Sequence, residues 1–244
     1  MSDIARNLAQ VQERIAGAAL RAGRDPARIT LVAVTKTRPA EAVTAAYQAG
    51  MRHFGENRVE EGMAKIPVVN AAIAGSRPAW HMVGHVQSRK ARAVVAQFDY
   101  VHSVDRLKIA RRLSGFAQEA GRALPALLEC NVSGEEAKYG FDLRGWEQDE
   151  ARREAFFAAV EEILALPGLS VQGLMTMAPL VTDPETVRPV FASLRALLDA
   201  LRERFPAHDW PHLSMGMTDD FEVAIEEGAT MVRIGRAIFG ARSY

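Results

Sequence analysis

The chain has 244 residues, of which 48% are hydrophobic, and its 30 basic side chains balance 30 acidic ones. A full apolar core is therefore available, whereas the net positive charge that binding to nucleic acid or an anionic membrane requires is absent. The single cysteine, Cys130, excludes an intrachain disulfide and a cysteine-based metal cluster, and without a signal peptide or membrane-spanning run we expect a cytoplasmic protein.

A leading stretch over 3–22 has apolar residues at helical spacing and predicts a helix that ends before Gly23. Short β-branched or apolar runs then alternate with longer helical patterns, as is typical of an α/β protein with a parallel sheet. We predict eight strands, at 29–36, 52–57, 79–85, 99–105, 126–132, 169–177, 212–217 and 231–235.

Eight strand-helix units in a chain of this length favour a (β/α)8 TIM-type barrel with an extra N-terminal helix. An open doubly wound sheet is the alternative, and it is weaker because no GxGxxG motif follows the first strand. No linker composition divides the chain, so residues 1–244 are expected to form one domain, with 134–150 as a long functional loop after the fifth strand.

Functional groups of such barrels gather at the carboxyl ends of the strands. The residues predicted at those ends are Lys36, Asn57, His85, Ser103, Asn131, Thr176, Ser214, Gly216, Arg233 and Gly235. So many polar groups at one rim exceed what a purely structural layer requires.

Lys36 closes the first predicted strand on the side of Val32 and Val34. One interpretation is a desolvated amine that forms a Schiff base with a carbonyl compound. The other is a strand-end lysine that extends into solvent. The spacing leaves both open.

Arg233 points into the barrel mouth if Val232 and Ile234 pack against the outer helices, and the alternative role is a buried ion pair. Gly235 and Arg236 then open a short helical turn, and N–H groups at such a turn suit a phosphate.

A second phosphate candidate follows the seventh strand, where Ser214 precedes Thr218, the expected N-cap of a helix that reaches Glu227. Asp219 and Asp220 lie in the first turn of that helix and would repel an anion, so the Gly235 turn is the stronger candidate. Ordinary capping is the structural alternative for Ser214 and Thr218.

Other candidates are weaker. His81 and His85 have i,i+4 spacing in a segment that reads as a strand, so no metal site is expected. Cys130 is expected to be structural. Methionines at strand spacing suit either a flat ligand or ordinary core packing; they are Met175, Met177, Met215 and Met217.

Seven motifs carry a family resemblance in order along the chain: VAVTKTRP, HFGENRVEE, HMVGHVQSRK, NVSGEEAKYGF, GLMTMAP, LSMGMTDDFEVAI and VRIGRAIFG. Together they resemble the pyridoxal phosphate homeostasis protein family. The resemblance implies a barrel similar to the N-terminal domain of alanine racemase, with pyridoxal 5'-phosphate bound as a Schiff base to Lys36.

The resemblance also implies particular contacts. Phosphate contacts are implied for Ser214, Gly235 and Arg236, with Asn57 near the cofactor and Arg233 near the pyridine nitrogen. Thr218 stands where the family often has serine, and it keeps the hydroxyl. Ring contacts are further expected from Met175, Met177 and His85.

Two classes of function follow from this site. One is a carrier that buffers pyridoxal phosphate and passes it to apo-enzymes that depend on it, and the other is an amino-acid racemase or related enzyme. Racemisation needs a second acid/base group opposite Lys36. The alanine racemase tyrosine comes from a second domain for which we expect no residues here, so Tyr139 is the remaining candidate. A Schiff-base aldolase acting on a sugar phosphate is a third, more distant alternative.

Overall fold

Eight parallel strands close into a barrel in the computed structural model, which describes residues 3–135 and 138–241. Strand β1 pairs with both β2 and β9, and β4 pairs with β5, so the ring has no open edge. The eight strands are β1 (Thr30–Val34), β2 (His53–Glu56), β3 (Ala79–Met82), β4 (Tyr100–Val104), β5 (Leu124–Asn131), β7 (Leu169–Met175), β8 (His212–Ser214) and β9 (Met231–Ile234). The predicted barrel is confirmed, and the open sheet is excluded.

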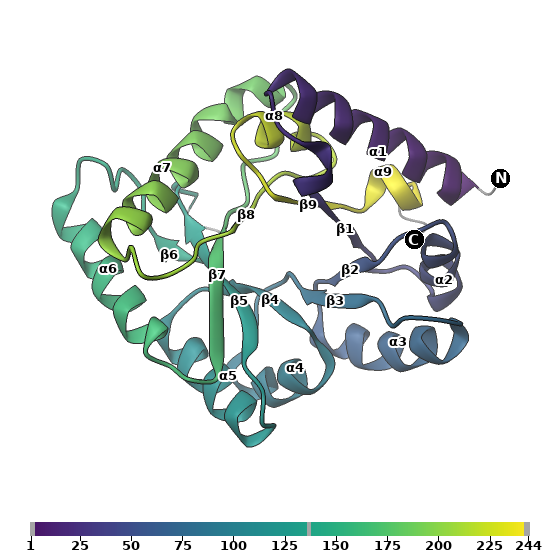
Figure 1. The fold of residues 1–244 in the computed structure, drawn as a ribbon, viewed down its shortest axis with the longest axis horizontal. Helices are drawn as coiled ribbons and strands as arrows, with labels where there is room; N and C mark the ends of the chain where they lie inside the picture. The colour runs from purple at the N-terminus through teal and green to yellow at the C-terminus, as the bar shows by residue number, and fades with distance from the viewer. Residues whose placement is uncertain (1–2, 136–137, 242–244) are drawn as a thin grey trace.

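Helices surround the ring of strands (Figure 1). The α-helices are α1 (Asp3–Arg21), α2 (Ala40–Gln48), α3 (Val59–Ala72), α4 (Ala91–Gln97), α5 (Leu107–Glu119), α6 (Glu150–Leu164), α7 (Arg188–Arg204), α8 (Phe221–Glu226) and α9 (Arg236–Phe239). Short 3-10 helices are η1 (Pro26–Arg28), η2 (Ser88–Lys90) and η3 (Pro184–Val187). The extra helix α1 packs against α8 and α9. None of the helices within the described ranges is both long and apolar enough to cross a membrane.

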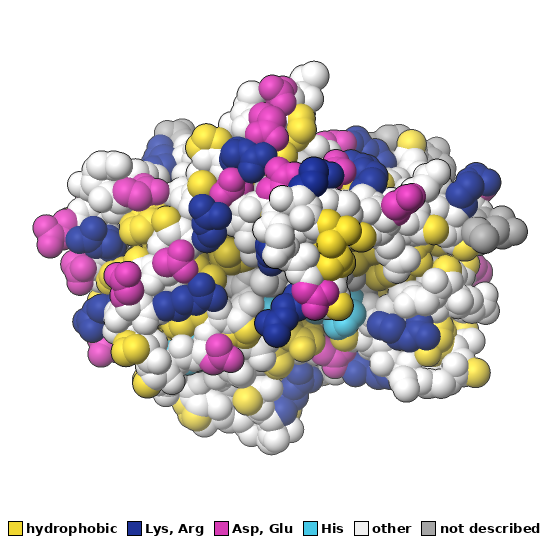
Figure 2. All heavy atoms as spheres, turned by 45° about the horizontal axis from the view of Figure 1, so that its top comes forward, with side chains coloured by type: hydrophobic (Ala, Val, Ile, Leu, Met, Phe, Trp, Pro, Cys, Tyr) yellow, Lys and Arg dark blue, Asp and Glu magenta, His cyan; other side chains and the backbone are white. Residues whose placement is uncertain are grey.

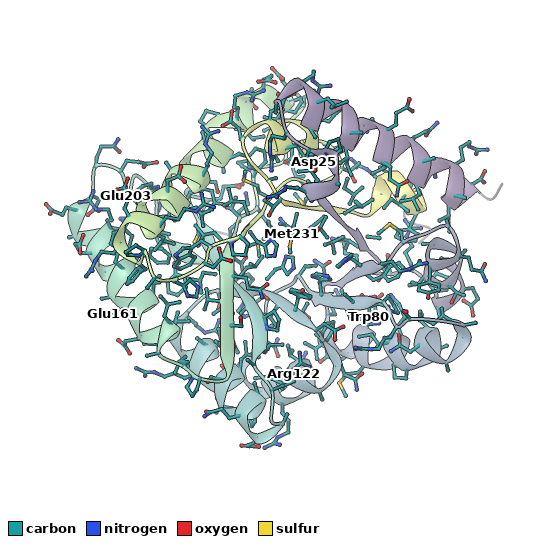
Figure 3. The ribbon with its side chains drawn as sticks, viewed as in Figure 1. Asp25, Trp80, Arg122, Glu161, Glu203 and Met231 are labelled. Atoms are coloured by element: carbon teal, nitrogen blue, oxygen red, sulfur yellow. The ribbon has the colours of Figure 1, made fainter. Side chains whose placement is uncertain are left out.

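Strand alternation sorts side chains between two apolar regions. Val232 and Ile234 belong to the main core between strands and helices, so Arg233 between them faces the interior of the barrel. Figure 3 shows Met231 inside the ring and Trp80 between the strands and α3. This arrangement confirms the condition on which the inward orientation of Arg233 depended.

Several strands end earlier than predicted. The third predicted strand stops at Met82, and the seventh, which is β8, stops at Ser214, two residues before Gly216, whose φ of +93° breaks the extended conformation. Lys36, Asn57 and His85 accordingly lie in the loops beyond the strand ends.

Two local predictions are wrong. Thr218 does not cap α8, because that helix begins at Phe221 and Asp220 precedes it, accepting a hydrogen bond from the Met217 N–H at 2.6 Å. The long loop after β5 contains a short unpredicted strand, β6 (Phe141–Asp142), that pairs with β5. Residues 136–137 of the NVSGEEAKYGF motif lie outside the described residues.

Candidate functional site

A cavity of about 880 Å³ opens at the carboxyl ends of the strands, which is a size suited to a small-molecule ligand. Six of the seven predicted cofactor-binding residues line it: Lys36, Asn57, Thr218, Arg233, Gly235 and Arg236. The seventh, Ser214, is fully buried and lies one layer deeper, where its hydroxyl accepts a hydrogen bond from Arg233. The structure therefore brings together residues from β1, β2, β8 and β9 with their following turns.

Lys36 lies two residues after the last residue of β1 and is half-buried at the cavity. Its neighbour Thr35 faces the opposite way, because the Thr35 hydroxyl donates to Glu56 Oε1 at 2.6 Å on the outer side of the barrel. The alternation that sends Thr35 towards helix α3 places the Lys36 side chain on the cavity side.

A buried polar network supports the turn that carries Lys36. Lys65 of α3 donates from Nζ to the carbonyl of Thr35 at 2.7 Å, to Glu56 Oε1 at 2.7 Å and to Glu61 Oε1 at 2.8 Å. Burial raises the pKa of Glu56, and the hydrogen bond from Lys65 opposes that effect. Two carboxylates and one ammonium thus hold the backbone beside Lys36.

Arg233 forms the inner wall of the cavity and is almost completely buried. Its guanidinium donates from Nη1 to Ser214 Oγ at 2.6 Å and from Nη2 to the carbonyl of Thr176 at 2.9 Å. Both acceptors are neutral, and across the described residues Arg233 makes no ion pair. Burial lowers the pKa of Arg233 to about 10, although the negative charges of Asp220 and Glu129 act to raise it. A second buried group, Glu129 on β5, has its pKa raised to about 7 by burial.

The Gly235 turn lies beside Lys36 for a steric reason. A Cβ on Gly235 would approach the carbonyl oxygen of Val34 to 2.9 Å, closer than a side chain tolerates. Glycine therefore lets the end of β9 lie directly against the end of β1. The first residue of α9, Arg236, pairs with Asp219 through its guanidinium, so that carboxylate is neutralised at the cavity rim.

Basic groups outnumber acidic groups among the described lining residues. The basic ones are Lys36, Arg38, Lys138, Arg233 and Arg236, and the acidic ones are Glu135, Asp219 and Asp220. Lys138 pairs with Glu135, and burial lowers the pKa of Lys138. The cavity thus favours an anionic ligand, while the outer face shown in Figure 2 mixes both signs of charge.

The side chain of Asn57 offers an open polar contact at the same cavity. Its Oδ1 is buried and accepts no hydrogen bond from the described residues. A buried acceptor without a donor is costly, so a ligand hydroxyl or N–H would stabilise it. This atom, the lysine and the basic excess fit a small, polar, anionic carbonyl compound.

The residues expected to contact the cofactor ring do not all lie at the cavity. Met177 and Met217 line the cavity, whereas Met175 packs inside the barrel with Leu127 and Met231. His85 is not among the described residues that line the cavity.

Two further side chains occupy positions away from the cavity wall. His85 Nδ1 lies 2.8 Å from Asp105 Oδ2, and the His85 ring stacks on Tyr139 with ring centroids 3.8 Å apart. Cys130 is buried, and burial raises the pKa of its thiol well above the ordinary value. That shift agrees with the structural role predicted for the cysteine, because a neutral thiol is a poor nucleophile.

Sequence reasoning missed the supporting groups. Lys65, Glu56 and Glu61 lie in helical or strand patterns that read as ordinary surface or core positions, yet Lys65 is buried. The one available signal was the alternation at the end of β2, which puts Glu56 on the apolar side with Phe54. A charged residue on that side needs a partner.

The chain is similar to one protein family over almost its whole length. The family described as "Alanine racemase, N-terminal domain" matches residues 2–243. Proteins named "Pyridoxal phosphate homeostasis protein" from Escherichia coli and Pseudomonas aeruginosa are each 44% identical over all of this chain and cover 99% and 98% of their own lengths. The solved structure of PipY from Synechococcus elongatus with PLP bound is 34% identical, covers 97% of this chain and 100% of that one, and has a TM-score of 0.80.

Proposed function

Because the chain belongs to the pyridoxal phosphate homeostasis protein family, we propose that it binds pyridoxal 5'-phosphate in the cavity at the carboxyl ends of the strands and buffers the cofactor for enzymes that depend on it. The observation that carries this proposal is the placement of Lys36 in a cavity whose lining is rich in basic groups. Bound there, the cofactor supplies an aldehyde that an amine can capture as a Schiff base.

Each residue at the cavity has a distinct part in the proposal. Lys36 provides the covalent attachment, and the Gly235 turn with Arg236 and Thr218 receives the phosphate. A phosphate monoester carries about −1.5 to −2 charges at neutral pH, so the basic excess stabilises it. Arg233 faces the pyridine nitrogen.

Two further residues complete the binding site. Asn57 accepts a hydrogen bond from the cofactor through its carboxamide oxygen, which is buried and has no donor among the described residues. Ser214 acts through Arg233, since its hydroxyl lies below the cavity and already accepts from the guanidinium. Residues 1–244 act as one cofactor-binding domain.

The carrier role is favoured over catalysis by the chemistry of Arg233. A guanidinium facing the pyridine nitrogen disfavours protonation of that nitrogen, which weakens the ring as an electron sink. Tyr139, the candidate second acid/base group, stacks on His85, is 55% exposed and is not among the described residues that line the cavity. We infer that the protein holds the cofactor and releases it in the cytoplasm to dependent apo-enzymes.

The purified protein tests this proposal by its absorption spectrum. Addition of pyridoxal phosphate is expected to produce a visible Schiff-base band that hydroxylamine removes. A Schiff-base aldolase would show no such band, and its lysine would instead be trapped by borohydride in the presence of a sugar phosphate. Absence of the band at saturating pyridoxal phosphate would refute the proposed function.

A further inference from the structure

A row of hydrogen-bonded side chains crosses the interior of the barrel. His53 Nδ1 lies 3.0 Å from His81 Nε2, and His81 Nδ1 lies 2.9 Å from His102 Nε2. His102 Nδ1 lies 2.9 Å from Ser214 Oγ, to which Arg233 donates at 2.6 Å. These five residues are termed the interior chain.

Strand register explains the path of the interior chain. His53 lies beside Ala79, so His81 is two residues further along the neighbouring strand. The same offset recurs between β3 and β4 and between β8 and β9, because the strands of a barrel are staggered. His53 also lines a hollow of about 360 Å³ at the amino-terminal end of the barrel. The interior chain therefore connects that hollow with the cofactor cavity.

Arg233 determines the direction of the interior chain, that is, which atom donates and which accepts in each of its hydrogen bonds. A guanidinium only donates hydrogen bonds, so Ser214 Oγ accepts from it. The hydroxyl hydrogen of Ser214 is buried, and His102 Nδ1 is the other partner of that oxygen among the described residues. If Nδ1 of His102 carried a hydrogen, the serine hydroxyl would have no acceptor. The hydroxyl thus donates to Nδ1, and all three histidines carry their hydrogen on Nε2.

The same geometry keeps the buried histidines neutral. A second proton on His81 would direct its Nδ1–H at the Nε2–H of His102, and a second proton on His102 would leave the Ser214 hydroxyl without an acceptor among the described residues. Burial lowers the pKa of both rings well below the ordinary value, and the neighbouring His212 lowers both further, as Arg233 does for His102. Tyr100 stacks on His81 with ring centroids 4.5 Å apart and encloses it.

We propose that His81 and His102 are positioning residues, which through Ser214 fix the guanidinium of Arg233 at the cavity. The identity of the ligand rests on the proposed function, whereas the direction of the interior chain does not.

Nitrogen-15 NMR of the histidine rings in the ligand-free protein tests the direction. His53, His81 and His102 are expected in the Nε2–H tautomer, and an Nδ1–H tautomer at His102 would overturn the proposal. Ser214→Ala removes the donor and is expected to give a mixture of tautomers at His102. The control Tyr100→Phe alters a ring beside His81 that is outside the interior chain, and it is expected to keep the wild-type tautomers. Unchanged tautomers in Ser214→Ala would also contradict the proposal.

Matched variants of His102 test the positioning role. His102→Gln retains an acceptor and a donor, whereas His102→Leu has neither. We expect pyridoxal phosphate affinity to fall about tenfold in His102→Leu, the scale of one hydrogen bond to a charged group, and much less in His102→Gln. Equal losses in the two folded variants would overturn the role. The wild-type tautomer measurement decides the direction even if a variant does not fold or pyridoxal phosphate does not bind.

Discussion

Glu61 Oε1 accepts a hydrogen bond from the backbone N–H of Thr37, the residue that follows Lys36, at 2.5 Å. The same carboxylate accepts from Lys65, which also donates to the carbonyl of Thr35. The backbone on both sides of Lys36 is therefore anchored to α3. Thr37 has a φ of 63°, which residues other than glycine rarely adopt, so the turn depends on such anchors.

Loss of the anchor at Glu61 is expected to weaken cofactor binding. Glu61→Ala frees the Thr37 N–H and lowers the affinity for pyridoxal phosphate by about tenfold, measured by absorbance titration. Glu60→Ala is the matched control, because Glu60 lies in the same helical turn, is exposed and pairs with Lys90. Glu61→Gln keeps an acceptor oxygen and is expected to bind nearly as the wild type does. Equal affinities of Glu60→Ala and Glu61→Ala would show that the anchor is irrelevant.

The covalent attachment is expected at Lys36 and not at the other lysine of the cavity, Lys138. Lys36→Ala should lose the visible Schiff-base band while the far-ultraviolet circular dichroism stays unchanged, because a turn residue contributes little core packing. Lys138→Ala should keep the band, because the family resemblance implies attachment at Lys36 and the Lys138 ammonium donates to the carbonyl of Met177 at 3.0 Å. Borohydride reduction followed by peptide mass spectrometry identifies the modified residue. A reducible adduct on Lys138 in the wild type would contradict the assignment.

Glu129 is expected to make the stability of the cofactor-free protein depend on pH. Its pKa is about 7 in the folded protein against an ordinary 4.5, so the folded state binds the proton more tightly than the unfolded state. Stability therefore falls as pH rises through 4.5 to 7, by on the order of 3 kcal/mol.

Glu129→Gln removes this titration. The variant is expected to be more stable than the wild type at pH values above the raised pKa and to show a flatter pH profile, as measured by urea unfolding across that range. The comparison is made without cofactor, so that binding does not contribute. Parallel pH profiles of the two proteins would exclude Glu129 as the titrating group.

Amino-acid racemisation is expected to be negligible. The holo-protein incubated with L-alanine in deuterium oxide should show no deuterium at Cα and no D-alanine, because racemisation needs a second acid/base group opposite Lys36, and the candidate Tyr139 stacks on His85 and is not among the described residues that line the cavity. Turnover at about 1 per second or faster would overturn the carrier role. In that event Tyr139→Phe would be the first variant to examine.

Much of the fold follows from local patterns. Apolar alternation and helical spacing involve neighbouring residues, so they predicted the eight strands and the leading helix to within a few residues. The same alternation put Lys36 on the side of Val32 and Val34 and put Arg233 on the side opposite Val232 and Ile234, but it did not decide which side faces the cavity. Strand ends were predicted less well, because Gly216 and the turn after Met82 end their strands through backbone conformation and packing.

The sequence by itself determined the eight-strand barrel, the position of Lys36 and Arg233 at the ends of their strands, and the family. Only the tertiary structure decided which side chains support Lys36 and Arg233. Ser214 and His102 are 112 residues apart in the chain and meet across the barrel, and Lys65 of helix α3 reaches Thr35 at the end of β1. No local pattern encodes such contacts, because they depend on strand register and barrel closure, which bring together side chains from distant segments.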